Sequence, residues 1–192
     1  MPEISVLTRR DHAISALALA LFGCGWFGWG QADPPDPLQL WLGVGGCLGL
    51  LLAAAGALTA FREPRTGSSL TRDRAALGRY LILCRIEFGL AFAGALALGL
   101  SGSADYIAVV VCAVVGAHFL PLSTILHDRS LIPLGVLVCA VATTALVLGL
   151  TTHVSPSAVT GFGTGCALVG HAATSLTWAL RTPSNRPVIL DA

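Results

Sequence analysis

The sequence predicts an all-α fold, a bundle of six transmembrane helices that forms a single domain over residues 1–192, with both termini on the cytoplasmic side. Three observations lead to this prediction. The chain is 55% hydrophobic and only 11% charged, with a mean hydropathy of +0.79, whereas soluble domains carry about 25% charged residues. Six apolar stretches are long enough to span a bilayer. The arginines also fall on one side of the membrane once six helices are threaded.

The first three helices are bounded by clear breaks. Residues 13–30 form an apolar run that ends at a proline-rich turn, and the second run, residues 38–60, follows that turn. The one long polar loop, residues 62–78, comes next and is expected in the cytoplasm. The third run, residues 79–100, extends to a Ser-Gly-Ser turn at residues 101–105.

The last three helices are separated by shorter turns. Residues 106–126 end at the His-Asp-Arg-Ser turn of residues 127–130, and residues 131–150 follow directly. The last run, residues 157–180, begins after the polar turn of residues 151–156. Because backbone polar groups cannot stay unpaired in hydrocarbon, each run should be helical.

The arginines give the bundle a definite orientation, because cytoplasmic loops carry an excess of basic residues. With six spans, ten of the eleven arginines flank the helices on one side, and the opposite loops hold Asp33, Asp36, Asp105 and His153 but no arginine. We therefore expect both termini in the cytoplasm and the bundle in the cell inner (plasma) membrane. The absence of lysine, together with abundant Ala and Gly, is typical of a GC-rich bacterial genome.

Several classes of site are not expected. A net charge of +1 offers no field to attract nucleic acid. The chain has no P-loop, no GxGxxG before a helix, no HExxH, no GxSxG and no DDxxD-type cluster. Metal sites need clustered ligands, and cysteines in apolar segments usually serve as small hydrophobic residues. No metal and no cofactor are therefore predicted, although six cysteines lie in six different runs: Cys24, Cys47, Cys84, Cys112, Cys139 and Cys166.

Ionisable groups inside a bilayer are costly, so each marks a candidate site. Counted from the flanking charges at 1.5 Å per residue, Glu87 lies about 12 Å from the inner surface, and His118 and His171 each lie about 15 Å from it. These three are the candidate catalytic residues, and Glu87 is the candidate proton donor. An ion pair or an interhelical hydrogen bond is the structural alternative for Glu87. Arg85 points to another helix face and can reach the inner surface.

A proline follows one of these histidines. Pro121 cannot donate a hydrogen bond to the carbonyl of Ala117, the residue before His118. The resulting kink can open a cavity or a gate. Alternatively, a neighbouring helix satisfies the bend and His118 is its hydrogen-bond partner.

The combination suits a metal-independent enzyme for a lipophilic isoprenoid that enters from the inner leaflet. A protonated Glu87 would open an epoxide or protonate an alkene, and the aromatic faces of Phe88, Phe92 and Phe119 would stabilise the carbocation. Arg85 is a further candidate substrate-binding residue.

The size, the apolar helical build and the motif Arg85-Ile86-Glu87-Phe88 resemble the small integral-membrane terpene cyclases of indole-terpenoid and meroterpenoid pathways. This resemblance implies cyclisation initiated by protonation. The fungal relatives have seven spans and a second essential acid, and this chain has neither, so the resemblance does not extend to a two-acid mechanism. The segment His118-Phe119-Leu120-Pro121-Leu122 also resembles uncharacterised small bacterial membrane proteins.

Two other functions stay open at this point. In a proton-coupled transporter or channel, Glu87 and the histidines would form a proton relay. The internal repeat of many transporters is not evident here, although a homo-oligomer would supply symmetry. In a membrane assembly or interaction protein, the same side chains would hold neighbouring helices together.

Overall fold

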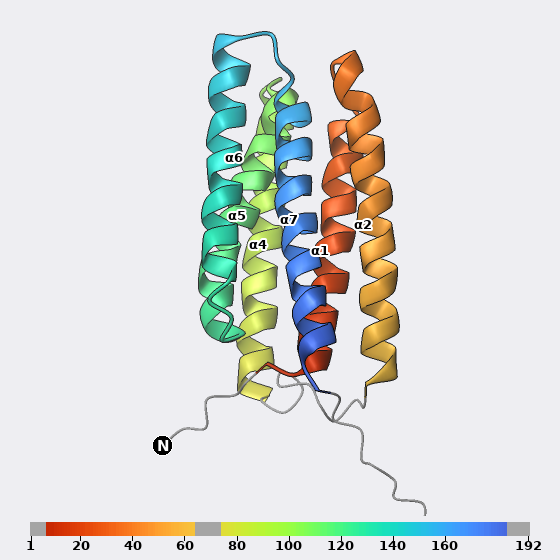
Figure 1. Cartoon of the computed structure of the whole chain (residues 1–192). Helices are drawn as coiled ribbons and strands as arrows, with labels where there is room; N and C mark the ends of the chain where they lie inside the picture. Colours follow the sequence, from red (N-terminus) through yellow and green to blue (C-terminus); the bar gives the residue numbers. More distant parts are fainter. Residues whose placement is uncertain (1–6, 64–73, 184–192) are drawn as a thin grey trace, which may run out of the picture.

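The computed structural model describes residues 7–63 and 74–183, and in these residues the chain is an all-helical bundle without strands (Figure 1). The first predicted helix forms between a capping box at Thr8 and a turn at Gln31. A short 3-10 turn, η2 (Ala104–Tyr106), leads into the fourth long helix. The six long helices are α1 (Arg9–Gly30), α2 (Asp36–Arg62), α4 (Arg74–Leu100), α5 (Ile107–Ile125), α6 (Leu131–Thr151) and α7 (Pro156–Arg181).

Five of these helices, α1, α2, α4, α5 and α6, are long and apolar enough to cross a membrane. The sixth predicted span forms α7, which is equally long but carries more Thr, Ser and Gly. Its polar residues are partly sheltered, because Thr160 and Thr164 are fully buried. α7 contacts α1, α2, α5 and α6 and so lies at the centre of the bundle.

The helices form an incomplete ring. Going around the bundle, α2 packs on α1, α1 on α7, α7 on α6, α6 on α5 and α5 on α4. Among the described helices, α4 has extensive contacts with α5 alone. Most of its side chains are exposed, and only Ala76 is buried in the described part of α4. α2 packs on the outside of both α1 and α7, and in the described residues α4 has no extensive contact with α1, so the ring is open between α4 and α1.

Glycines allow the closest helix contacts. A Cβ added to Gly161 of α7 would lie 2.4 Å from the Cα of Gly30 in α1. At the α5–α6 contact, a Cβ on Gly116 would lie 2.8 Å from the backbone nitrogen of Cys139. Small residues let membrane helices approach closely and gain van der Waals contact, so these two crossings fix the positions of α1 and α5.

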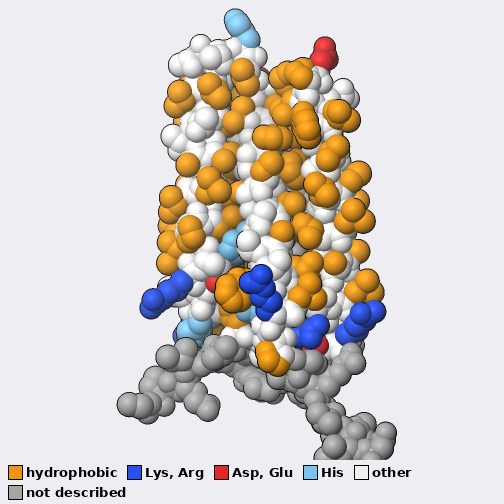
Figure 2. All heavy atoms as spheres, viewed as in Figure 1, with side chains coloured by type: hydrophobic (Ala, Val, Ile, Leu, Met, Phe, Trp, Pro, Cys, Tyr) orange, Lys and Arg blue, Asp and Glu red, His pale blue; other side chains and the backbone are white. Residues whose placement is uncertain are grey.

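The arginine side chains gather at one end of the bundle, while hydrophobic side chains cover its flanks (Figure 2). α1 begins and α7 ends at this same end (Figure 1). Here Arg10 Nη1 donates to the carbonyl of Glu63 at 3.0 Å, and Arg9 Nε lies 3.4 Å from Glu63 Oε1. These contacts join the start of α1 to the end of α2.

The helices extend further at this end than the hydropathy predicted. α1 begins at Arg9 rather than at residue 13, and α4 begins at Arg74 rather than at residue 79. Charged turns of helix can continue beyond the apolar run, because their side chains remain in a polar environment. Most of the predicted polar loop, residues 64–73, lies outside the described residues. The cytoplasmic location of both termini stays a prediction.

Candidate functional site

A pocket of about 470 Å³ occupies the opening between α1 and α4. α5 and Leu168 of α7 form its inner wall. The lining is mainly apolar, and its polar groups come chiefly from α4 and α5. The aromatic and polar lining residues are Phe22, Trp26 and Trp29 from α1, Tyr80, Cys84, Glu87 and Phe88 from α4, and His118 and Phe119 from α5.

A single stripe of α4 faces the inside of the bundle. Tyr80, Cys84, Glu87, Ala91 and Gly94 follow one another at spacings of four and three residues, and all are partly buried. Residues three and four apart share one helix face. Glu87 points inward because it belongs to this stripe. The far end of the stripe packs closely on α5, since a Cβ added to Gly94 would lie 2.6 Å from a methyl group of Val110.

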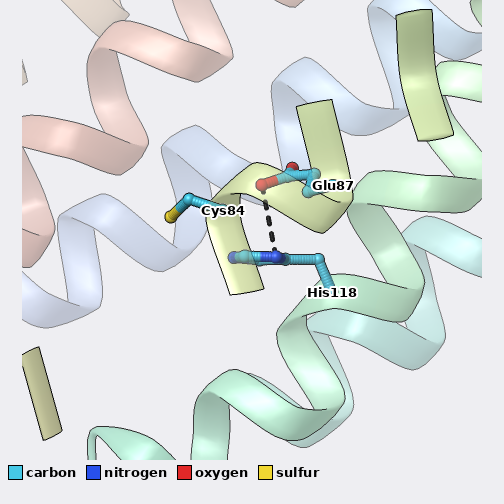
Figure 3. Close-up of side chains that lie close together, drawn as sticks. All are labelled: Cys84, Glu87 and His118. Carbon is cyan, nitrogen blue, oxygen red and sulfur yellow. Dashed lines mark ion pairs between the residues drawn. The ribbon is translucent and has the colours of Figure 1, made fainter. Parts of the chain in front are cut away.

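Glu87 meets His118 across the α4–α5 contact (Figure 3). Glu87 Oε2 lies 3.2 Å from His118 Nδ1, and the two side chains are 17% and 8% exposed. His118 is directed to α4 because Gly116, two residues earlier, packs against α6 on the other side of α5. Nδ1 is buried, and beyond this contact with Glu87 it makes no hydrogen bond to the described residues. The pair combines an acid and a base at a distance short enough for proton exchange.

Cys84 lies one helical turn before Glu87 on the same stripe. Its sulfur, a Glu87 carboxylate oxygen and a ring nitrogen of His118 all lie within 4.8 Å of one another. In Figure 3 the three side chains form one cluster between α4 and α5. This is the group in the described part of the chain that could hold a metal ion.

Aromatic rings line the same pocket as the pair. Trp26 and Trp29 of α1 stack with their ring centroids 5.3 Å apart, and Phe119 packs edge-on to the His118 ring. Phe22 and Phe88 also line the pocket, yet they are 61% and 65% exposed. These two exposed rings therefore mark a lateral opening on the flank of the bundle.

The other predicted site residues lie apart from this pair. Arg85 is exposed and Phe92 is 71% exposed, and neither lines the pocket. His171 of α7 has its Nε2 3.2 Å from Ser130 Oγ, and that hydroxyl donates to the Asp128 carboxylate. The three candidate catalytic residues were predicted at a similar depth, but they do not form one cluster. Glu87 pairs with His118, and His171 contacts Ser130 separately.

Sequence reasoning did not single out the remaining pocket residues. Tyr80 and Cys84 share the heptad-like spacing of the α4 stripe. On α1, Phe22, Gly25 and Trp29 repeat the same spacing. Such a stripe marks a face of a helix, and could have drawn attention to these residues. It does not say which other helix that face meets.

Comparisons with known protein families, with curated proteins and with solved structures found no match to this chain.

Proposed function

We propose that this protein is a membrane-embedded enzyme that uses Glu87 and His118 for proton transfer on a lipophilic, isoprenoid-like substrate. The observation that supports the proposal is the 3.2 Å Glu87–His118 contact in the wall of an otherwise apolar, aromatic pocket. Buried ionisable groups in membrane helices are costly, so a matched pair facing a cavity favours a functional role.

The pocket suits an apolar ligand of moderate size. Its volume of about 470 Å³ lies within the usual range of roughly 300–1,000 Å³ for small-molecule sites. The opening between Phe22 and Phe88 is on the flank of the bundle, which would face lipid in a membrane. A prenyl chain could therefore enter sideways from the bilayer, without crossing water.

The proposed reaction is an isomerisation in which protons balance. The neutral Glu87 carboxyl gives its proton to an epoxide oxygen, and the C–O bond breaks with its electron pair remaining on that oxygen. The electrons of a nearby alkene close a ring on the electron-poor carbon and leave a new carbocation. His118 then removes a proton from the carbon next to that cation, which forms an alkene. The proton returns from His118 to Glu87 across the 3.2 Å contact, and this restores the starting state.

The aromatic rings would stabilise the positive intermediate. A cation over an aromatic face gains about 0.5–2 kcal/mol, with indole the most effective ring. Trp26, Trp29 and Phe119 line the same pocket as the acid. An apolar pocket inside a bilayer would also exclude water, which would otherwise capture the carbocation.

The test is turnover of a polyprenyl epoxide by the full chain in lipid nanodiscs, with products identified by mass spectrometry. Glu87→Gln should lower turnover at least about 100-fold, because general acid catalysis typically contributes 10²–10⁴-fold. Asp105→Asn, which changes an acid in η2 that does not line the pocket, is the matched control and should retain wild-type activity.

Equal turnover by Glu87→Gln and wild type would exclude Glu87 as the proton donor. A wild-type protein that neither converts the epoxide nor binds it would refute the proposed substrate class. Binding is read from quenching of the tryptophan fluorescence, since Trp26 and Trp29 line the pocket.

A further inference from the structure

We propose that Cys84, Glu87 and His118 form a binding site for one zinc-class divalent ion. Two neighbouring helices bring a thiol, a carboxylate and an imidazole together, with their ligand atoms within 4.8 Å of one another. The His118 side chain is only 8% exposed, and its Nδ1 makes no hydrogen bond. A buried nitrogen without a hydrogen bond is uncommon, and a metal ion bound between Nδ1 and Glu87 Oε2, which lie 3.2 Å apart, would coordinate both atoms.

The distances are close to those of a tetrahedral zinc site. Zinc binds imidazole nitrogen and carboxylate oxygen at about 2.0–2.2 Å, which places two such ligands about 3.3 Å apart at the tetrahedral angle. The observed distance of 3.2 Å between Glu87 Oε2 and His118 Nδ1 matches this value. The Cys84 sulfur would have to approach to about 3.5 Å from the other ligands, because its bond to zinc is about 2.3 Å.

That approach requires a movement of little more than about 1 Å from the upper limit of 4.8 Å. Rotation of the Cys84 side chain can supply part of it. Small rotations of the Glu87 and His118 side chains can supply the rest. The site can therefore close without disturbing the α1–α7 contact.

The donor set selects the metal. Thiolate and imidazole favour zinc and neighbouring transition metals over Mg²⁺ and Ca²⁺, which prefer oxygen ligands. One thiolate and one carboxylate also cancel the two positive charges of the ion. Net neutrality matters here because an uncompensated charge is costly in apolar surroundings.

Three protein ligands leave a fourth position open, as in catalytic zinc sites. Cys84, Glu87 and His118 all line the pocket, so this position would face the pocket and accept water or a ligand atom. Metal binding and proton donation by Glu87 exclude one another, because a metal-bound carboxylate carries no proton to give. The metal site itself does not rest on the proposed reaction.

The test is metal binding by the full, tag-free chain in detergent after removal of metal with a chelator. Titration with Co²⁺ should give a thiolate-to-cobalt charge-transfer band that saturates at one ion per chain. Zn²⁺ should abolish the band by displacing cobalt. Cys84→Ser should remove the band, and Glu87→Gln and His118→Ala should each weaken zinc binding at least about 100-fold, since loss of even an outer-shell partner costs about 10–100-fold.

Matched controls are Cys47→Ser on α2 and His153→Ala in the turn before α7, both remote from the pocket lining. Both should bind cobalt and zinc like wild type. A wild-type chain without the charge-transfer band would overturn the proposal, and so would a band that survives in Cys84→Ser or is lost in Cys47→Ser. Absence of the band in wild type is decisive by itself, and the variants are compared only where circular dichroism shows wild-type helix content, so that misfolding of a variant does not obscure the result. No step of this test depends on turnover, so the metal titration and the turnover assay give separate results, and the metal-free chain is the form to test for proton donation by Glu87.

Discussion

The α1–α7 crossing should be the most sensitive point of the bundle to a single added methyl group. A Cβ on Gly161 would lie 2.4 Å from Gly30 Cα, 2.5 Å from Gly30 N and 2.7 Å from the carbonyl oxygen of Trp26. All three atoms belong to the backbone of α1, so no side-chain rotation can relieve the overlap. Carbon atoms prefer a separation of about 3.5–4.0 Å. Gly161→Ala must therefore push the two helices apart by about 1 Å.

The expected cost is about 1–3 kcal/mol, the usual penalty for overpacking a well-packed interior. Alanine also favours the helix by up to about 1 kcal/mol relative to glycine, which partly offsets this penalty in Gly161→Ala. Gly170→Ala on the same helix separates the two effects, because its Cβ would meet nothing within 4 Å. Relative to Gly170→Ala, Gly161→Ala should be less stable by the full steric cost.

The measurement is the free energy of unfolding from titration with SDS in mixed micelles, followed by circular dichroism. Gly170→Ala should be at least as stable as wild type. The displaced backbone at Trp26 should also weaken binding of an apolar ligand, because this residue lines the pocket. Equal unfolding free energies for Gly161→Ala and Gly170→Ala would refute the close α1–α7 contact and the role given to it.

Two further predictions concern the ends of the helices and the separate histidine. Thr8→Ala should lower the free energy of unfolding by about 1 kcal/mol, because the Thr8 side chain and Asp11 form the capping box of α1. The same SDS titration measures this change. A variant as stable as wild type would contradict this role of the cap. His171→Ala should keep the turnover of the wild type within about twofold, since His171 contacts Ser130 outside the pocket, whereas His118→Ala should lose it at least about 100-fold. A loss in His171→Ala as large as that in His118→Ala would show that His171 takes part in the reaction.

Hydropathy and breakers were sufficient for the fold class. Each apolar run forms one helix, because a chain this rich in apolar residues satisfies its backbone polar groups most simply within helices. The boundaries were less predictable. At the arginine-rich end, the capping box at Thr8 extends α1 beyond its apolar run. The composition also did not reveal that α7, the least apolar of the six, lies at the centre of the bundle.

The candidate residues were only partly predictable. Glu87 and His118 stood out because charged and titratable groups are rare inside apolar helices. Cys84 did not, because a cysteine in an apolar run normally serves as a small hydrophobic residue. Its place beside a carboxylate and an imidazole depends on the contact between α4 and α5.

By itself, the sequence determined that this chain is a bundle of apolar helices and that Glu87, His118 and His171 are its unusual interior groups. Periodicity and hydropathy are local properties, so they can be read along the chain. The tertiary structure alone decided that Glu87 pairs with His118, that His171 contacts Ser130 instead, and that α1 and α4 leave an aromatic pocket between them. The physical reason is that the neighbours of a helix depend on which small residues allow close approach. Gly30 acts together with Gly161, and Gly116 together with Gly135, and the two members of each pair lie on different helices.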